Sequence, residues 1–535
     1  MIKRPGQRHY SAEVMILAVS VWMVLFDNYS FFSHLLSTYP ITVTNIGFLI
    51  SLCLLFTAIM VILLAAMGIG RLLKLILIII LMVGSVTAYF MDSYNTIISM
   101  EVVKSVLQTD VSESFGLLNV KLALYLGLIG VLPSFLVCRV NIRTLPFRMA
   151  FFSRLKLFGA SAAVIFSMLL IFSDAYASFF REHKSIRYYT NPTTPIYAAF
   201  KYFNGRLVSD GNFTYQKIGL DAHRDIYVGK RKLLILVIGE TARADRFSLN
   251  GYIKNTNPLL DQRHVVSFDN VWSCGTATSV SVPCMFSSLN QSNYREKVAE
   301  NTDNVLDVLK RAGVHVVWFD NNSDSKGVAL RVPYASYRSS SINPDCDIEC
   351  RDVGMLVGVK KFVSETPAGD ILVVLHQMGS HGPEYAKRYP KEFEHFSPSC
   401  QSNLLNECSQ DEINNAYDNS ILYTDYFLSQ IIDYLKSQTS QMSTAMLYIS
   451  DHGESLGESG IYLHGFPYSF APDVQKHVPM IFWADSDYIE SKKDILDKSS
   501  VERRLSHDNL FHTVLGLMAI KTSIYKAEMD IFSDG

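Results

Sequence analysis

The sequence predicts a chain of two unlike parts, a bundle of five membrane-spanning helices followed by one large α/β domain with a mainly parallel sheet. The 535 residues are 49% hydrophobic, and the long apolar runs gather before residue 175. After residue 230, short apolar runs alternate with helical stretches, which is typical of a parallel sheet covered on both faces. The net charge of −2 gives no indication of a nucleic-acid partner.

Five apolar runs are each long enough for a membrane span, since about 20 helical residues cross a hydrocarbon core of about 30 Å. They cover approximately residues 14–32, 46–67, 72–91, 120–140 and 155–172. Buried helices of a soluble core are the alternative, but these runs follow one another with little polar sequence between them. The first run resembles a signal peptide, yet no small-residue cleavage site follows it, so we expect a retained anchor. Residues 1–173 are therefore predicted to form a transmembrane domain.

Basic residues predict the orientation of the spans, because they collect on the cytoplasmic side of a membrane. They precede the first span, join the second to the third, and lie around the connection of the fourth to the fifth: Lys3, Arg4, Arg8, Arg71, Lys74, Arg139, Arg143, Arg148, Arg154 and Lys156. The alternate loops have one lysine and no arginine between them. We expect a cytoplasmic N-terminus and, with five spans, an outer location for everything after residue 175.

The cysteines support this location independently. Two of the eight lie in predicted spans, and the other six follow residue 175 as sequence-near pairs, namely Cys274/Cys284, Cys346/Cys350 and Cys400/Cys408. Local pairing is the simplest of the 15 possible connectivities, and it implies an oxidising compartment such as the bacterial periplasm. Free buried thiols and a Cys-rich zinc site are the alternatives, but the sequence has no Cys-x-x-Cys spacing for zinc.

Residues 174–229 are predicted to connect the two parts. The segments 179–181 and 197–203 mix aromatic and basic residues, as helices lying in a membrane interface do, although a linker packed on the outer domain has the same composition. Residues 230–535 are enough for one large domain. Its predicted buried strands are Leu233–Ile238, Val314–Phe319, Ile371–Leu375, Ala445–Ile449 and Val478–Trp483, with helices at Val305–Ala312 and Ala416–Lys436 among them.

Polar residues follow four of these predicted strands. Glu240 follows the first, the stretch Asp320–Lys326 the second, His376–Gly382 the third and Asp451-His452 the fourth. The carboxyl ends of parallel strands meet at one edge of a sheet, so we expect these groups to lie together. Carboxylates and neutral imidazoles are ligands suited to Zn²⁺. His376 is as compatible with a structural role as with binding, whereas His381 and His464 are flanked by glycine and are better candidates.

Hydroxyl groups between Ser273 and Cys284 supply a possible nucleophile. A helix that begins near Thr278 would place this hydroxyl where unpaired backbone N–H groups favour an anion. Coordination to zinc would lower the pKa of such a hydroxyl and make it nucleophilic at neutral pH. A capping threonine in a Ser/Thr-rich turn is the alternative, and spacing alone does not separate Thr276, Thr278 and Ser279.

Over nearly its whole length the chain resembles the phosphoethanolamine transferases of the Gram-negative inner membrane, which include lipid A modifying enzymes and the mobile colistin-resistance proteins. The shared strings are Gly239–Asp245, Ser273–Thr278 with Val282–Ser287, Asp320–Lys326, His376–Pro383, Ser450–Glu458 and Tyr462–Gly465. The resemblance implies an alkaline-phosphatase/sulfatase-like fold for the C-terminal domain. It also implies one zinc ion, with a second compatible with the motifs.

The resemblance assigns roles to individual residues. It implies that Glu240, Thr278, Asp451 and His452 hold zinc and that Thr278 is the nucleophile. The positions implied to bind substrate are Ser323, Lys326, His376, His381 and His464, together with Thr109 and Glu113 in a membrane-side segment that contacts lipid. Several relatives carry Asn where Ser105 stands, so we expect a weaker contact at that position.

The expected reaction is transfer of phosphoethanolamine from phosphatidylethanolamine to a phosphate of lipid A through a phosphoethanolamine-threonine intermediate. This transfer would lower the negative charge of the cell surface and give polymyxin and colistin resistance. The expected protein is a monomer in the bacterial inner membrane with a periplasmic catalytic domain. The alternatives are a core-sugar or glucan acceptor, a membrane-anchored phosphatase, sulfatase or glycerophosphate-transferring polymerase, and a non-catalytic sensor or assembly factor. Retention of Glu240, Thr278, Asp451 and His452 argues against the last.

Overall fold

The computed structural model describes residues 9–67, 72–108, 117–143, 145–183, 186–207, 214–224, 229–490 and 503–533. Contacts divide the chain into two compact units. The helical unit comprises Met1–Val103 and Leu117–Asn204, and the α/β unit comprises Lys104–Gly116 and Gly205–Gly535. The short segment that begins at Lys104 therefore belongs to the α/β unit although it lies, in sequence, between two long apolar helices.

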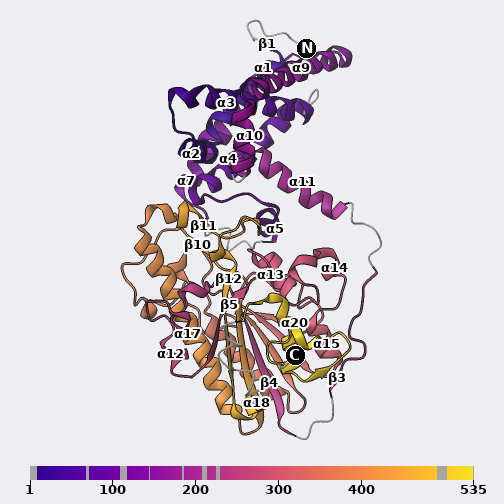
Figure 1. Ribbon diagram of the computed structural model, residues 1–535, viewed down its shortest axis with the longest axis vertical. Coiled ribbons are helices and arrows are strands. Elements are labelled where there is room, and N and C mark those ends of the chain that lie inside the picture. Colours follow the sequence, from indigo (N-terminus) through magenta and orange to yellow (C-terminus); the bar gives the residue numbers. More distant parts are fainter. Residues whose placement is uncertain are drawn as a thin grey trace. The chain divides into compact units, whose positions relative to one another are not determined.

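The helical unit is built from long apolar helices joined by short connections (Figure 1). In chain order the helices are α1 (Ala12–Phe26), α2 (Tyr29–Thr38), α3 (Val43–Met67), α4 (Leu72–Tyr94), the start of α5 (Met100–Gln108), α7 (Val120–Tyr125), the π-helical η1 (Leu126–Val131), α8 (Leu132–Arg139), α9 (Phe147–Ile171), α10 (Ser173–Glu182) and α11 (Thr193–Leu207). A short parallel strand pair joins β1 (His9–Tyr10) to β2 (Asn141–Ile142).

Four helices of the described chain are long and apolar enough to cross a membrane, namely α3, α4, the continuous run Val120–Arg139, and α9 from Arg148. A fifth span is formed if α1 and α2 count as one, and these two helices meet at 58°. The bend falls at two polar residues, Asp27 and Asn28, and the Asn28 side chain donates to the carbonyl oxygens of Met23 and Asn191. The first predicted span is therefore broken at this bend, where a polar side chain donates to backbone carbonyl groups.

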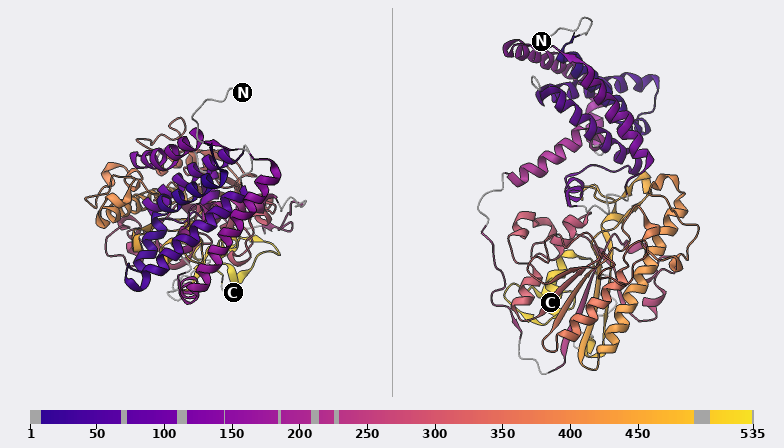
Figure 2. Two further views of the ribbon diagram at one scale, coloured as in Figure 1. Left: turned by 90° about the horizontal axis from the view of Figure 1, so that it is seen from above. Right: turned by 180° about the vertical axis from the view of Figure 1, so that it is seen from behind.

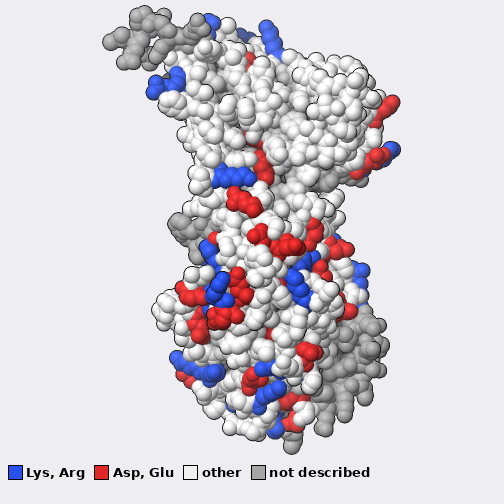
Figure 3. Space-filling model, turned by 90° about the vertical axis from the view of Figure 1, so that its left-hand side faces the viewer, with Lys and Arg blue, Asp and Glu red and all other residues white. Residues whose placement is uncertain are grey.

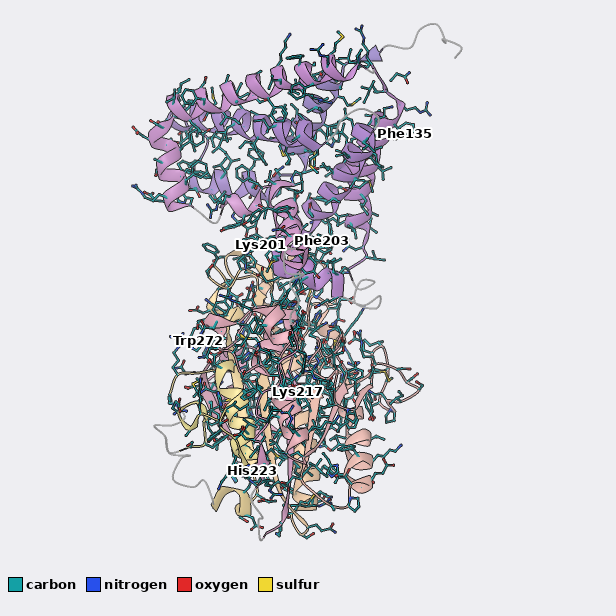
Figure 4. The ribbon with its side chains drawn as sticks, turned by 90° about the vertical axis from the view of Figure 1, so that its right-hand side faces the viewer. Phe135, Lys201, Phe203, Lys217, His223 and Trp272 are labelled. Atoms are coloured by element: carbon teal, nitrogen blue, oxygen red, sulfur yellow. A yellow bond between two sulfur atoms is a disulfide. The ribbon has the colours of Figure 1, made fainter. Side chains whose placement is uncertain are left out.

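Charged residues are sparse on the surface of the helical unit, where Figure 3 shows wide areas without Lys, Arg, Asp or Glu. This is expected of a surface that meets hydrocarbon. α9 begins at Phe147, earlier than the predicted residue 155. Aromatic side chains are exposed along α11, and among them Phe203, labelled in Figure 4, is 51% exposed. The interfacial role of α10 and α11 stays a prediction.

One mixed sheet of eight strands forms the centre of the α/β unit (Figure 2). Its strands, in spatial order, are β13 (Leu505–Ser506), β5 (Val266–Trp272), β12 (His477–Ala484), β9 (Met442–Ser450), β4 (Arg231–Gly239), β8 (Ile371–His376), β6 (His315–Asp320) and β7 (Tyr334–Ser336). β9, β4, β8, β6 and β7 run parallel, whereas β12 is antiparallel to both its neighbours. The five predicted strands are present, and the mainly parallel fold class is confirmed.

Helices cover both faces of this sheet because successive side chains of its strands point to opposite sides. On β4, Leu234, Leu236 and Ile238 pack against one face, while Leu233 and Val237 pack against the other. The first core includes α13 (Thr278–Met285), α15 (Val305–Arg311) and α20 (Leu510–Leu517); the second includes α12 (Pro258–Asp261), α16 (Met355–Glu365) and α17 (Gln410–Gln438). Capping boxes start α15 and α17.

The remaining short elements lie at the periphery of the sheet. They are α14 (Glu296–Glu300), α18 (Ser486–Glu490), the pair β3 (His223–Arg224) and β14 (Ile520–Lys521), and the pair β10 (Ser455–Leu456) and β11 (Tyr462–Leu463). Disulfides join Cys274 to Cys284, Cys346 to Cys350 and Cys400 to Cys408, as the sequence predicts. Cys53 and Cys138 are free thiols.

Candidate active site and metal centre

The acidic groups of the site directly follow two neighbouring parallel strands, β4 and β9. Gly239 pairs in register with Ser450, so Glu240 and Asp451, the next residues of β4 and β9, emerge side by side. Thr241 follows with a positive φ of 52°, which is unusual for a β-branched residue, and its N–H donates to Asp451 Oδ1 at 3.2 Å. Backbone strain of this kind collects at functional sites, and here it turns the chain so that both carboxylates face one point.

The hydroxyl of Thr278 faces these carboxylates from the N-terminus of α13. Its Oγ1 lies 3.0 Å from Glu240 Oε2, 3.3 Å from Glu240 Oε1 and 3.2 Å from His452 Nε2. The two neighbouring hydroxyls do not take part, since Thr276 Oγ1 donates to the Phe466 carbonyl oxygen and Ser279 Oγ lies 3.2 Å from Ser105 Oγ. The geometry therefore selects Thr278 among the three residues that spacing left open.

The imidazole of His452 is oriented for binding through one nitrogen. Nδ1 lies 2.9 Å from the Gly453 carbonyl oxygen, to which it donates, so Nε2 keeps its lone pair. Nε2 lies 3.4 Å from both Glu240 Oε1 and Asp451 Oδ2. Burial, with His464 close by, lowers the pKa of His452 well below its usual value, and the ring is neutral at physiological pH.

This cluster has more hydrogen-bond acceptors than donors. Ligand atoms of Glu240, Asp451 and His452 lie within 4.8 Å of one another, and all three side chains are buried. Asp451 Oδ2 has no hydrogen-bond partner among the described residues, and burial raises the pKa of this carboxyl to about 6. The Thr278 hydroxyl has a single proton to share. Two carboxylates and an imidazole lone pair around one buried point fit a divalent cation with N/O preference.

Asn322 supports the Glu240 carboxylate, a role that the sequence did not reveal. Its Nδ2 donates to Glu240 Oε2 at 2.7 Å and to the Gln377 carbonyl oxygen at 2.7 Å. The residue follows β6, in the polar stretch from Asp320 to Lys326. Its position in that stretch was the available signal, but asparagines are common in turns, and nothing in the sequence distinguishes this one from Asn321.

His376 is held by a carboxylate on the neighbouring strand. Asp320 and His376 pair in register across β6 and β8, and Asp320 Oδ2 lies 3.0 Å from His376 Nδ1 and 2.8 Å from Trp318 Nε1. His376 Nε2 is buried and has no hydrogen-bond partner in the described part of the chain. This arrangement fixes the tautomer and leaves Nε2 available to the site, as in carboxylate-histidine pairs beside metals.

His464 and His381 form a second group beside the cluster of Glu240, Asp451 and His452. The ring centroid of His464 lies 4.3 Å from that of His452 and 5.8 Å from that of His381. The buried Glu454 accepts from His464 at Nδ1 (2.7 Å) and from the Tyr385 hydroxyl (2.7 Å). Desolvation, with Arg388 and His464 nearby, lowers the pKa of His381 well below its usual value. Glu454 is a second supporting residue that the sequence did not assign.

Lys326 and Ser323 contact each other in the turn after β6. Lys326 Nζ donates to the Ser323 hydroxyl at 2.8 Å and to its carbonyl oxygen at 3.0 Å, and both side chains are partly exposed. This pair follows Asn322 in the sequence, and none of its described contacts is a bond to Thr278. Thr109 and Glu113 lie outside the described residues.

Two carboxylates, an imidazole and a hydroxyl meet at one buried point beside a mainly parallel sheet, and Glu240, Asp451 and His452 could hold a metal ion. Residues 232–520 match the sulfatase family model, which defines the class of this domain. Residues 56–207 match the model of phosphoethanolamine transferase EptA/EptB. The chain is 41% identical over 528 residues to phosphatidylethanolamine transferase Mcr-1 of Escherichia coli, with 96% of each chain covered. The chain therefore belongs to the phosphoethanolamine transferase family, as its motifs indicate.

Two solved structures show the same architecture. The integral membrane protein lipooligosaccharide phosphoethanolamine transferase A (EptA) from Neisseria meningitidis matches with a TM-score of 0.93 at 32% identity, covering 98% of this chain and 99% of that chain. The zinc complex of the C-terminal periplasmic domain of EptC from Escherichia coli shares the fold at 22% identity, with a TM-score of 0.50 and coverage of 59% and 89%.

Proposed function

We propose that this protein transfers phosphoethanolamine from phosphatidylethanolamine to a phosphate group of lipid A, with Thr278 as the residue that carries the group between them. The observation that supports the proposal is the position of Thr278 Oγ1, which lies 3.0–3.3 Å from Glu240 Oε1, Glu240 Oε2 and His452 Nε2. Similarity to the phosphatidylethanolamine transferase Mcr-1 supports the donor.

The first step forms a bond between Thr278 Oγ1 and the donor phosphorus and breaks the phosphorus–oxygen bond to diacylglycerol. Glu240 Oε2 accepts the hydroxyl proton, and this proton passes to the oxygen of diacylglycerol, which leaves as the alcohol. In the second step an oxygen of the singly protonated acceptor phosphate attacks the phosphorus, and the bond from the phosphorus to Thr278 Oγ1 breaks. The proton of the acceptor phosphate passes to Thr278 and restores its hydroxyl.

We propose zinc as the ion that Glu240, Thr278, Asp451 and His452 hold, on the basis of their donor set and their burial. Bound there, zinc would lower the pKa of the threonine hydroxyl and neutralise charge on the transferred phosphate. Lys326 with Ser323, and His376, His381 and His464, are proposed to bind the phosphate oxygens and carry protons. A role in lipid contact for Thr109 and Glu113 stays a prediction.

Location and phenotype follow from the same proposal. The apolar helices would anchor the protein in the bacterial inner membrane with a cytoplasmic N-terminus and a periplasmic α/β unit, where both lipids are at high local concentration. Addition of an amine-bearing group would lower the negative charge of lipid A, and each basic contact of a cationic peptide with such a surface is worth about 1 kcal/mol. Polymyxin and colistin resistance is the expected phenotype.

Mass spectrometry of lipid A from cells that express the protein tests the proposal. We expect a phosphoethanolamine adduct with the wild type and none with Thr278→Ala, and covalent labelling of the purified protein by phosphatidylethanolamine only while Thr278 is present. Thr276→Ala is the matched control, since its hydroxyl is bonded to the Phe466 carbonyl oxygen. Unmodified lipid A with an active control enzyme, or labelling that survives Thr278→Ala, would contradict the proposal.

The sulfatase match also favours a second candidate, a hydrolase in which water takes the place of the acceptor. Release of free phosphoethanolamine without any lipid A adduct would support it. A protease-accessibility experiment on spheroplasts tests the orientation, because only a periplasmic α/β unit is digested from outside.

A further inference from the structure

The helix that carries Thr278 contains a proline at a position that removes a backbone donor. In an α-helix the N–H of each residue donates to the carbonyl oxygen four residues earlier. The partner of the Ser279 carbonyl would be residue 283, which is proline and has no N–H. The residue after the proposed nucleophile therefore has a carbonyl oxygen without its usual intrahelical donor.

A lysine 175 residues earlier in the sequence supplies a donor to this carbonyl. Lys104 Nζ lies 2.5 Å from the Ser279 carbonyl oxygen, and the same ammonium pairs with Glu296 Oε1 at 2.8 Å. The next residue, Ser105, places Oγ 3.2 Å from Ser279 Oγ. Lys104 is only 4% exposed, and a lysine this buried needs a counter-charge such as Glu296.

We propose that Lys104 is a positioning residue, whose ammonium replaces the N–H that Pro283 lacks and holds the first turn of α13 so that Thr278 Oγ1 faces Glu240 and His452. The inference rests on the proposed function, because it assumes that Thr278 is the nucleophile. A phosphate-binding role is the competing explanation for a lysine near the site. The contacts favour positioning, because Nζ already donates to a backbone carbonyl and pairs with a carboxylate. Both groups belong to the protein and neither belongs to a substrate.

The position of Lys104 in the sequence adds a consequence. It lies on α5, between the long apolar helices α4 and the run Val120–Arg139, yet it belongs by its contacts to the α/β unit. The chain between two predicted spans thus supplies part of the support for the nucleophile. A small displacement of a catalytic group from its productive geometry has a large effect on rate, so this contact is expected to affect the transfer step.

A double-mutant cycle on the full-length protein, in mixed micelles with phosphatidylethanolamine, tests this inference. Lys104→Met is expected to slow the covalent labelling of Thr278 by about tenfold, the effect of about 1.4 kcal/mol from one unsatisfied buried carbonyl. The donor concentration that gives half-maximal rate should stay unchanged. In the Pro283→Ala background, where residue 283 regains an N–H, the same Lys104→Met change should alter the rate by less than about twofold.

Lys310→Met is the matched control, because this lysine also donates to a backbone carbonyl, that of Arg331, at a site away from α13. Its labelling rate should equal that of the wild type. If Lys104→Met fails to fold, the double variant carries the test, since it is expected to fold and to label.

Three outcomes separate the possibilities. A wild-type protein that is never labelled refutes the proposed function and leaves the helix contact itself unaffected. A labelled wild type with an unchanged Lys104→Met rate, or a double variant as slow as Lys104→Met alone, overturns the positioning role. A raised half-saturating donor concentration also overturns it, because that result assigns Lys104 to substrate binding.

Discussion

Two fully buried aspartates of the α/β unit are compensated in opposite ways. Asp418 accepts from Lys254 Nζ at 2.7 Å, from the Tyr252 hydroxyl at 2.9 Å and from Arg246 Nη1 at 3.4 Å. Asp451 accepts two backbone N–H groups on Oδ1, whereas its Oδ2 has no hydrogen-bond partner among the described residues. A buried carboxylate is costly unless it is paired, so one aspartate is neutralised by the chain, whereas the other fits the proposed role of binding a cation.

This difference separates a structural cluster from a functional one without reference to any relative. In the Asp418 cluster, Arg246 and Lys254 neutralise the buried carboxylate. These ion pairs also join α17 to the segment that carries Arg246. The cluster at Thr278 leaves two carboxylates close together and lowers the stability of the metal-free protein. Sites that bind a catalytic ion keep such unfavourable groups because the free energy of ion binding offsets the free energy lost by burying them.

Asp451→Asn should have the largest effect on activity. We expect phosphoethanolamine transfer to fall by at least about 10³-fold, as for other losses of a major electrostatic group at a reaction centre. Turnover of the full-length protein in detergent, measured with added zinc, checks this value. Activity within tenfold of the wild type would contradict the assignment of Asp451 as a metal ligand.

The same substitution should stabilise the chelated, metal-free protein. Burial raises the pKa of Asp451 in the folded state to about 6, above its unfolded value of about 3.9, so ionisation destabilises the fold as pH rises through 6. The gain in melting temperature from Asp451→Asn should therefore be small near pH 4, grow between about pH 4 and pH 6, and stay constant at higher pH. A gain that is independent of pH would exclude Asp451 as its source.

Asp418→Asn should destabilise the protein and leave its chemistry intact. Loss of the charge leaves Arg246 and Lys254 without a full partner in a mostly buried place, and we expect a cost of about 2–3 kcal/mol. Thermal denaturation measures this cost, and turnover per folded molecule should stay within about twofold of the wild type. A selective loss of turnover would show that the two clusters are coupled.

Asp320→Asn tests the support of His376. An amide cannot hold Nδ1 as a carboxylate does, and loss of such an outer partner typically lowers activity by about 10- to 100-fold. The turnover should fall, and the half-saturating donor concentration should rise, because His376 is proposed to bind the phosphate oxygens. Asn321→Asp, next to it in sequence, is not a suitable control because Asn321 contacts Asp352; Asp269→Asn on β5 serves instead.

Lys254→Met should have the smallest effect in the series. The Lys254 side chain is 31% exposed, and Arg246 and Tyr252 remain bonded to Asp418. Partly exposed ion pairs contribute about 0.2–1 kcal/mol, so the melting temperature should drop only slightly and turnover should not change. A loss as large as that of Asp418→Asn would show that Lys254 alone neutralises the cluster.

Local patterns in the sequence predict most of the fold and the polar residues that meet beside the sheet. The sequence shows the strand Leu233–Ile238 as a short apolar run that is followed by a carboxylate. In the structure this strand is slightly longer, Arg231–Gly239. β5 was not predicted, because Ser267, Asp269 and Asn270 interrupt its apolar pattern. The bend at Asp27 and Asn28 was also not predicted, since it depends on a partner at Asn191.

The supporting residues were not predictable, for a physical reason. Glu454, Asn322 and Lys104 act through contacts with residues far away in the sequence, and no local spacing records such a contact. A lone polar residue in a turn or on a helix has the same appearance whether or not it orients a catalytic group. Only the folded structure shows which residues they meet, namely Glu240 for Asn322, His464 for Glu454 and Ser279 for Lys104.

The strand order also determines when the site can form during synthesis. β9 lies at the centre of the sheet, between β4 and β12, although it is among the last strands to be made. Glu240 and Thr278 are translated long before Asp451 and His452. A nascent chain that ends before residue 451 therefore has only half of the proposed ligands, so the proposed metal site is complete only after β9 has taken its place in the centre of the sheet.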